Sequence, residues 1–405
     1  LSRAIPSEVV AAHRAVRQRR GGTGAPVEVV AIDCPSGLDA DTGAARLPEE
    51  ARAQGGRPAM AADLTLTFHR AKPGQYLGQG PALCGALQIV PLDLETDRIA
   101  PGDWREHRAR RLSRIRLLDA ATGRPGRLRR ALLGPACHKY ERGHALVLAG
   151  GVGRGGAARM AARAALRAGA GLVTLGCPPA AVIENAAQLN AVMLRPVADA
   201  AALASLLEDA RLSAVCLGPG LGTGEGTRAL VAAALEARRA TVLDADALTS
   251  FEGAPATLFG MLHRRCVLTP HAGEFARLFP DLAPDPEAWR SALDAAREAA
   301  ARAGCTVLLK GAATVIAAPD GRTALHAAAY EAAVPWLATA GAGDVLAGII
   351  AGLLARPDGA DPFARVGMAA WLHAAAARAA GPGLIAEDLP EAIPAVLRAA
   401  GVTHL

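Results

Sequence analysis

Residues 341–344 read Gly-Ala-Gly-Asp and run directly into an apolar segment with helical spacing. Small residues let the backbone approach a ligand closely. The first N–H groups of a helix have no partner within the helix, and they lie at the positive end of its dipole. Such a turn binds anions, most often phosphate. Asp344 is either a helix cap or a catalytic base there, and the turn alone does not separate the two roles.

Five short apolar runs after residue 143 each end in residues that could carry out chemistry. Helical segments at 157–168, 227–238 and 287–302 separate several of them, and this alternation predicts a parallel sheet with helices on both faces. The carboxyl ends of parallel strands meet at one edge, which is where ligands bind in open α/β sheets. The runs, each with its terminal residues in parentheses, are 144–149 (glycine loop 150–156), 214–217 (glycine loop 218–224), 241–243 (Asp244 and Asp246), 266–269 (His271) and 306–309 (Lys310).

The glycine loop at 151–156 also satisfies the G-x-G-x-x-G pattern of dinucleotide-binding domains. That pattern requires an acidic residue at the end of the next strand to hold the ribose. The next strand ends in residues 174–179, Thr-Leu-Gly-Cys-Pro-Pro, without an acid. No phosphate-binding P-loop and no G-x-S-x-G hydrolase elbow occurs in the sequence. A Rossmann dehydrogenase is therefore disfavoured.

The charge is concentrated in one stretch. The chain of 405 residues has a formal charge of +6, and ten arginines lie within residues 105–130. A nucleic-acid surface would have aromatic residues between the charges, but aromatics make up only 3% of the chain. We therefore predict a solvated arginine-rich linker over residues 98–136, and no nucleic-acid partner.

Cysteine usage and hydropathy indicate the compartment. The seven cysteines are scattered without any C-x-x-C spacing, so neither a disulfide framework nor a zinc site is indicated. No apolar run approaches the ~20 residues that span a membrane, and no signal peptide is recognisable. Buried reduced thiols in a cytoplasmic protein fit these observations.

Residues 1–97 contain a few strands of a further α/β layer, at 27–32, 63–68 and 86–90. The first strand is followed by a turn with Asp33 and Ser36. Such a turn could present a carboxylate and a hydroxyl to a sugar or a cation. A plain Pro/Gly/Asp turn is the alternative, and composition alone favours it.

Seven ordered motifs after residue 136 resemble the ribokinase-like carbohydrate kinase superfamily, specifically the ADP- or ATP-dependent NAD(P)H-hydrate dehydratase. The resemblance covers residues 137–405. Residues 24–94 look like the C-terminal half of an NAD(P)H-hydrate epimerase domain, so we expect three parts: 1–97, the linker 98–136, and 137–405. The motifs are His138-Lys139, Gly169-Ala170-Gly171, GPGLG at 218–222, DADAL at 244–248, TPHAGE at 269–274, KGAATVI at 310–316 and GAGDVLAG at 341–348.

The resemblance implies a reaction and roles for particular residues. Enzymes of this family phosphorylate the 6-hydroxyl of a hydrated nicotinamide from ADP or ATP, and elimination then restores NAD(P)H. Asp344 is similar to the family's base, and Ala157, Gly222 and His271 match positions that contact the hydrate. Mg²⁺ is expected with the nucleotide phosphates, without an assigned protein ligand. The nucleotide-binding residues would be Lys310, Gly311, Ala312, Ala313, Thr314 and Gly343.

The sequence departs from the family pattern in several places. Ala313 replaces a usual Gly and Ala342 replaces a frequent Thr, and both are small. Asp33 matches a substrate-contacting carboxylate of the epimerase and Ser36 a K⁺ ligand. The glycine- and asparagine-rich loop that begins the epimerase is not found before them. From this we expect dehydratase activity with little or no epimerase activity, and the family suggests a homotetramer.

Two other functions remain open at this point. A sugar or vitamin kinase of the same superfamily would use Asp344 in the same way, and only the epimerase-like segment argues for hydrate repair. A non-enzymatic binding protein would not need the intact Gly-Ala-Gly-Asp and Lys-Gly motifs. The sequence does not separate ADP from ATP or NADH-hydrate from NADPH-hydrate.

Overall fold

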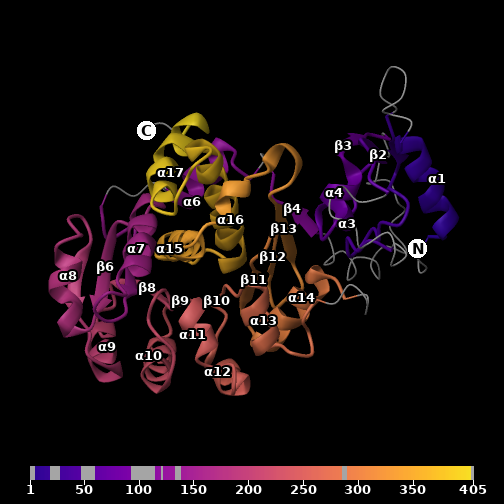
Figure 1. Ribbon diagram of the computed structural model, residues 1–405. Helices are drawn as coiled ribbons and strands as arrows, with labels where there is room; N and C mark the ends of the chain where they lie inside the picture. The colour runs from indigo at the N-terminus through magenta and orange to yellow at the C-terminus, as the bar shows by residue number, and fades with distance from the viewer. Residues whose placement is uncertain are drawn as a thin grey trace, which may run out of the picture. The chain divides into compact units, whose positions relative to one another are not determined.

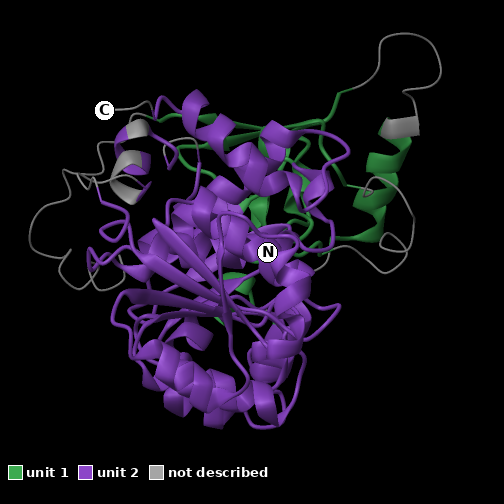
Figure 2. Cartoon of the chain, turned by 90° about the vertical axis from the view of Figure 1, so that its left-hand side faces the viewer, with its two compact units in different colours: residues 1–112, 284–295, 327–333 green, residues 113–283, 296–326, 334–405 purple. Residues whose placement is uncertain are grey.

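The computed structural model describes residues 5–18, 28–46, 60–92, 115–119, 122–132, 138–284 and 290–402. The chain divides into two compact units, which Figure 2 shows in two colours. Unit 1 comprises Leu1–Leu112, Pro284–Ala295 and Ala327–Ala333. Unit 2 comprises Ser113–Ala283, Ala296–His326 and Val334–Leu405.

Unit 1 is built on a three-stranded parallel sheet in the order β1-β2-β3. Its strands are β1 (Val30–Ile32), β2 (Leu64–Phe68) and β3 (Ala86–Val90), which match the three runs expected from the sequence. A small core forms around Leu38, Met60 and Leu83. The helices are α1 (Ser7–Gln18), α3 (Pro73–Tyr76) and α4 (Gly80–Cys84), with a 3₁₀ turn at Tyr330–Ala332.

Unit 2 contains a ten-stranded sheet in the order β4-β13-β12-β11-β10-β9-β8-β5-β6-β7 (Figure 1). The neighbours from β11 across to β7 pair in parallel, whereas β12 runs antiparallel to β11. The strands are β4 (Ile115–Leu117), β5 (His144–Leu148), β6 (Leu172–Cys177), β7 (Met193–Pro196), β8 (Leu212–Leu217), β9 (Ala240–Leu243), β10 (Cys266–Leu268), β11 (Thr306–Leu309), β12 (Ala313–Ala317) and β13 (Thr323–Ala327).

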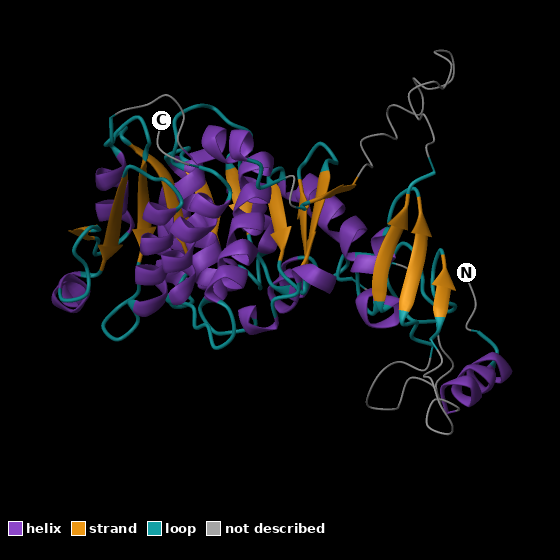
Figure 3. Ribbon diagram, turned by 90° about the horizontal axis from the view of Figure 1, so that it is seen from above, coloured by secondary structure: helices purple, strands orange, loops and turns teal. Residues whose placement is uncertain are grey.

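Helices cover both faces of this sheet, as the alternating pattern predicted. In Figure 1, α15, α16 and α17 lie on one face, and α10, α11 and α12 lie on the other. Figure 3 looks down on the first face and shows its helices covering the strands. The helices are α6 (Pro125–Leu132), α7 (Gly156–Arg167), α8 (Val182–Ala186), α9 (Ala200–Leu207), α10 (Glu225–Glu236), α11 (Ala245–Thr249), α12 (Pro255–Met261), α13 (Ala272–Leu278), α14 (Ala292–Ala303), α15 (Ala342–Leu354), α16 (Pro362–Ala380) and α17 (Asp388–Ala399), with 3₁₀ turns at Pro179–Ala181 and Pro335–Leu337.

Helix α15 is the most buried helix of the fold, and almost every residue after its first turn is inaccessible to solvent. It packs closely on α7. A Cβ added at Gly348 would lie 2.1 Å from the Ala161 carbonyl oxygen, and one at Gly352 would lie 2.4 Å from that of Ala165. The close approach of the two backbones fixes the position of α15, and therefore of the Gly-Ala-Gly-Asp turn at its start.

The expected linker over residues 98–136 is wrong where the structure describes it. Strand β4 pairs in parallel with β13 at the edge of the large sheet. Helix α6 buries Leu128 and Leu132 in the main core of unit 2. The arginines between these leucines obscure the apolar pattern in the sequence. Residues 98–114, 120–121 and 133–136 of the expected linker lie outside the described residues.

The length and hydropathy of the helices bear on a membrane location. None of the helices within the described residues is long and apolar enough to cross a membrane.

Candidate functional site

The strands β5, β8, β9, β10 and β11 are parallel neighbours, so their carboxyl ends form one rim. The two glycine loops touch there. A Cβ added at Gly150 would lie 1.9 Å from the carbonyl oxygen of Gly220, so this approach requires glycine. Ala157, in the first turn of α7, borders the same loops, because a Cβ added at Gly220 would lie 3.8 Å from the Cβ of Ala157.

Asp244, directly after β9, is held by two side chains from neighbouring strands. Its Oδ1 accepts hydrogen bonds from Thr269 Oγ1 at 2.8 Å and from Lys310 Nζ at 2.6 Å. The carboxylate side chain is only 2% exposed. Asp244 occupies the N-cap position of α11, but its side chain makes no capping hydrogen bond. The side chain therefore does not cap α11 and instead fixes the Lys310 ammonium on the rim.

Asp246 lies in the first turn of α11, and its carboxylate bonds to a neighbouring loop of the rim. Its Oδ2 accepts a hydrogen bond of 2.8 Å from the backbone N–H of Gly222, in the second glycine loop. The carboxylate thereby ties the loop after β8 to the loop after β9. Gly222 belongs to the predicted hydrate-binding residues, so Asp246 positions one of them.

His271 is the N-cap residue of α13. Its Nδ1 accepts hydrogen bonds from the backbone N–H groups of Gly273 at 3.0 Å and Glu274 at 3.3 Å. Glu274 Oε2 in turn accepts from the His271 backbone N–H at 2.8 Å, which completes a capping box. An Nδ1 that accepts leaves the ring proton on Nε2. The side chain is 54% exposed, so it combines a structural role with access to the rim.

Asp344 is the third residue of α15, and the N-cap of this helix is Gly341, with a left-handed φ of +88°. The capping interpretation of Asp344 is therefore wrong. Burial, followed by the nearby Asp244 carboxylate, raises the pKa of Asp344 to about 6. Lys310 opposes this shift, and Asp246 and Glu274 add to it more weakly. At neutral pH the group is ionised, but it is more basic than an ordinary aspartate.

Lys310 reaches the start of the same helix. A Cβ added at Gly343 would lie 3.4 Å from Lys310 Nζ, so no larger side chain separates the ammonium from the first turn of α15. A lysine and a helix N-terminus at one point create a positive site for an anion. Gly311 and Ala312 form the turn into β12, and Thr314 Oγ1 in that strand donates a hydrogen bond of 3.3 Å back to the Gly311 carbonyl.

The structure thus brings most of the predicted residues of unit 2 to one rim. Thr269 and Glu274 were not assigned a role from the sequence, although both lie in the quoted motif at 269–274. Thr269 could have been found from the sequence, because it is a polar residue at the end of a predicted strand. Its hydrogen bond to Asp244 could not have been found, because that contact depends on β9 and β10 being neighbours in the sheet.

Asp33 and Ser36 lie in unit 1. Asp33 follows β1 with a positive φ of 66°, and its carboxylate forms an ion pair with Lys72. Thr67 Oγ1 donates to the same oxygen at 3.2 Å. The hydrogen bond from Lys72 holds the pKa of Asp33 below its usual range. Ser36 is exposed in the following turn.

Comparison with known proteins agrees with these two parts. The family model for NAD(P)H-hydrate dehydratase matches residues 145–394, and that for the YjeF-related protein N-terminus matches residues 1–74. A bifunctional NAD(P)H-hydrate repair enzyme of Moorella thermoacetica is 37% identical over 385 residues, with 92% of this chain and 67% of the relative covered. Its counterpart from Synechocystis is 35% identical, with 87% and 62% covered. The chain therefore spans about two thirds of these relatives.

Solved structures confirm the ribokinase-like fold. A ribokinase-like superfamily protein of Enterococcus faecalis matches with a TM-score of 0.59 at 23% identity, over 71% of this chain and 97% of that one. The ADP/ATP-dependent NAD(P)H-hydrate dehydratase of Bacillus subtilis, co-crystallised with ATP and Mg²⁺, matches with a TM-score of 0.55 at 28% identity, over 71% and 99%. With a family model that covers more than half of its residues, the chain belongs to the NAD(P)H-hydrate dehydratase family.

Proposed function

We propose that this chain converts NAD(P)H-hydrate back to NAD(P)H at the expense of ADP or ATP. The observation that carries the proposal is the position of Asp344. A carboxylate with a raised pKa lies beside Lys310, in the first turn of a buried helix, on the rim of a parallel sheet. A base next to an anion site is the arrangement that phosphoryl transfer to a hydroxyl needs.

Asp344 acts as the base. It accepts the proton of the 6-hydroxyl while that oxygen attacks the terminal phosphorus of the nucleotide. The bond from phosphorus to the bridging oxygen breaks, and its electron pair stays with the departing nucleotide. The phosphate on C6 then leaves together with a proton from C5, which restores the ring double bond. A carboxylate with a pKa of about 6 is ionised at pH 7, and it is basic enough to accept the proton of the hydroxyl.

Lys310 and the N-terminus of α15 hold the phosphate that is transferred. The ion pair with Asp244 fixes the ammonium in place, so little reorganisation is needed when the nucleotide binds. Mg²⁺ neutralises phosphate charge when it binds with the nucleotide. Within the described residues, no group of three or more His, Cys, Asp or Glu side chains could hold a metal ion. We assign the ion mainly to phosphate oxygens and water, which is usual for Mg²⁺ bound with a nucleotide, and we name no protein ligand.

The hydrate and the nucleotide are assigned to different loops of the rim. We place the hydrate against Ala157, Gly222 and His271, beside the two glycine loops, where the His271 side chain is exposed. We place the nucleotide at residues 310–314 together with Gly343. We place the transfer of the phosphoryl group at Asp344, which is close enough to Lys310 of the nucleotide set for the ammonium to affect its pKa.

Three further parts of the proposal concern the whole protein. We propose that Ser36 in unit 1 is a ligand of K⁺. We also propose that the protein assembles as a homotetramer and that it is located in the cytoplasm. A potassium titration followed by the chemical shifts of the turn around Ser36, and light scattering of the purified chain, test the first two.

The competing proposal is a sugar or vitamin kinase, which would use the same rim. A substrate panel separates the two functions. We expect the chain to consume nucleotide with NADH-hydrate and not with ribose or hydroxymethylpyrimidine, with release of one phosphate for each NADH formed. A phosphorylated sugar or pyrimidine as the stable product, with NADH-hydrate unchanged, would overturn the proposal.

A further inference from the structure

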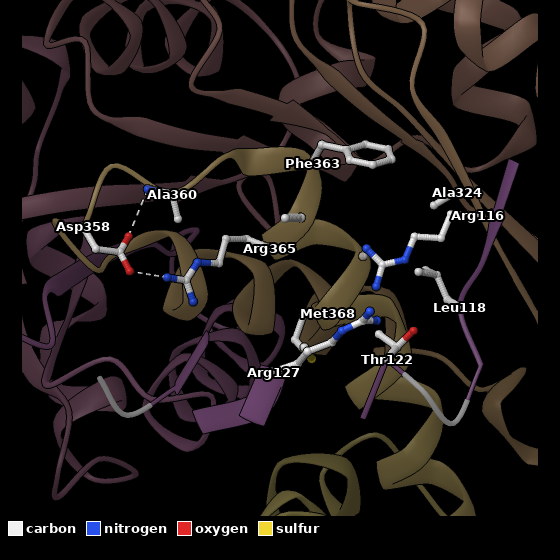
Figure 4. Close-up of a pocket in the computed structure, with 12 residues that line it drawn as sticks. Arg116, Leu118, Thr122, Arg127, Ala324, Asp358, Ala360, Phe363, Arg365 and Met368 are labelled. Atoms are coloured by element: carbon white, nitrogen blue, oxygen red, sulfur yellow. Dashed lines mark hydrogen bonds and ion pairs between the residues drawn. The ribbon is translucent and has the colours of Figure 1, made fainter. Parts of the chain in front are cut away.

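A cavity of about 430 Å³ lies in unit 2 and shares no residue with the rim described above. Strand β4, helix α6, and the start of α16 with the loop before it form its walls (Figure 4). Its volume falls in the range of small-molecule sites. The residues that matter for its chemistry are Arg116, Leu118, Thr122, Arg127, Phe363 and Met368.

The cavity is separate from the surroundings of Asp344 and shares no residue with them. Helix α15 starts at the rim and runs for 13 residues, which is roughly 20 Å at the rise of an α-helix. Just after its end, the carbonyl of Ala355 accepts a hydrogen bond from Ser213, near the amino end of β8. The cavity residues from 358 onward come after that point in the chain. A ligand there would not touch the nucleotide loop.

The charge in the cavity is positive. Three guanidinium groups and one carboxylate line it, and Asp358 is already paired with Arg365. Arg116 forms no ion pair within the described part of the chain. Burial, followed by the like charge of Arg127, lowers the pKa of Arg116, and the attraction to Asp119 is the smallest of the three effects. Two cations that share a cavity repel each other, and a bound anion would offset this repulsion.

A hydroxyl and an apolar wall complete the cavity. Thr122 is 3% exposed, and its Oγ1 has no hydrogen-bond partner among the described residues. A buried hydroxyl without a partner costs free energy that a ligand oxygen would recover. Leu118, Phe363 and Met368 provide apolar surface beside the charges, and Figure 4 shows the guanidinium ends of Arg116 and Arg127 near Thr122. The lining therefore suits a ligand with an anionic group and an apolar or ring part.

We propose that this cavity binds a small organic phosphate. Its phosphate oxygens accept hydrogen bonds from Arg116, Arg127 and the Thr122 hydroxyl, and its ring or apolar part rests on Phe363 and Met368. Planar guanidinium groups match phosphate oxygens in geometry, and a third donor favours phosphate over a carboxylate with its two oxygens. The inference does not rest on the proposed dehydratase function, because none of these residues belongs to the rim.

The test uses phenyl phosphate as the probe, in a ligand-observed NMR titration of the whole chain with ADP and Mg²⁺ at saturation. We expect saturable binding that persists with ADP present, and weaker binding of inorganic phosphate, benzoate and phenol. Arg116→Ala and Arg127→Ala should each weaken binding at least tenfold, and Arg116→Lys should weaken it less. Thr122→Val should weaken it several-fold.

Two control variants locate the probe. Arg264→Ala removes an exposed arginine elsewhere in unit 2 and should leave binding unchanged. Lys310→Ala should also leave it unchanged, although it disturbs the rim. Circular dichroism checks that each variant folds. The proposal is overturned if the wild type shows no saturable binding, if ADP displaces the probe, if benzoate binds as tightly, or if Arg116→Ala and Arg127→Ala bind like the wild type.

Discussion

Asp344 shares its surroundings with three other carboxylates, Asp244, Asp246 and Glu274, and with one ammonium, that of Lys310. Each nearby carboxylate makes the ionisation of Asp344 harder. Lys310 Nζ donates a hydrogen bond of 2.6 Å to Asp244. It therefore offsets only part of the rise in the pKa of Asp344. The result is a group that is charged at neutral pH and poised to accept a proton.

Removal of the base without a change in shape tests its role in the reaction. Asp344→Asn should lower kcat by a factor of roughly 10²–10⁴, the usual contribution of a general base, and should leave nucleotide affinity nearly unchanged. Steady-state rates and nucleotide titrations measure the two effects. Glu208→Gln, which neutralises an exposed carboxylate away from the rim, is the matched control and should retain full activity.

The same substitution should stabilise the protein, and the effect depends on pH. The pKa of Asp344 is raised from 3.8 to about 6 by folding, so between these values the native state holds a proton that the unfolded state has lost. Stability therefore falls as pH rises through this window. Asp344→Asn should raise the free energy of unfolding by about 1–3 kcal/mol at pH 8 and by almost nothing at pH 4. Denaturant melts at both values check this, and an equal gain at pH 4 would contradict it.

Lys310 should contribute to the stability of the fold as well as to nucleotide binding. Lys310→Met leaves the Asp244 carboxylate, which is 2% exposed, without its charged partner. The loss of one member of a buried ion pair typically costs about 3–5 kcal/mol. The double variant Lys310→Met/Asp244→Leu should recover much of this stability and remain inactive. A single variant as stable as the wild type would show that the pair is not structurally important.

At the scale of elements, contact between α15 and α7 positions the site. Gly348→Ala would place a Cβ 2.1 Å from the Ala161 carbonyl oxygen, so the two helices would have to separate. We expect a loss of about 1–3 kcal/mol, as for other overpacked cores, and a lower kcat because Asp344 moves with the helix. Gly260→Ala in α12, where a new Cβ has no neighbour within 4 Å, should be neutral or stabilising. Thermal melts and rates compare the two variants.

Elements with a clear apolar pattern could be predicted from the sequence, and elements defined by their neighbours could not. The runs that became β5, β8, β9 and β11 are mostly apolar, and their predicted bounds lie within two residues of the observed ones. Strand β4 has three residues with an arginine in the middle, and only its pairing with β13 makes it a strand. Helix α13 has seven residues, and it starts after His271, a residue without a strong preference for the cap position.

The site divides in the same way. The anion-binding turn and the rim could be inferred from glycine and polar residues at strand ends. The pairing of Lys310 with Asp244 joins residues that are 66 positions apart and depends on strand order. The pKa of Asp344 depends on burial that no local pattern reports. Its place as the third residue of α15 depends on where the helix starts, and sequence patterns locate a helix end only to within a residue or two.

At the scale of the whole molecule, the boundary of unit 2 lies at Ser113, not at the predicted residue 137. A fragment that starts at 113 keeps β4 beside β13 and keeps the fully buried Leu128 in the core. A fragment that starts at 137 exposes the edge of β13 and empties that part of the core. We expect the longer fragment to melt at a clearly higher temperature and to aggregate less. Equal melting temperatures would show that β4 and α6 contribute nothing to unit 2.

The most direct test of the central claim is the recovery of reduced nicotinamide absorbance when the purified chain meets NADH-hydrate, Mg²⁺ and either ADP or ATP. We predict that absorbance returns only when a nucleotide is present, with one nucleotide consumed per NADH formed, and that Asp344→Asn binds the nucleotide but restores absorbance at least about 100-fold more slowly. Recovery without any nucleotide, or recovery by Asp344→Asn at the wild-type rate, would contradict the proposed function.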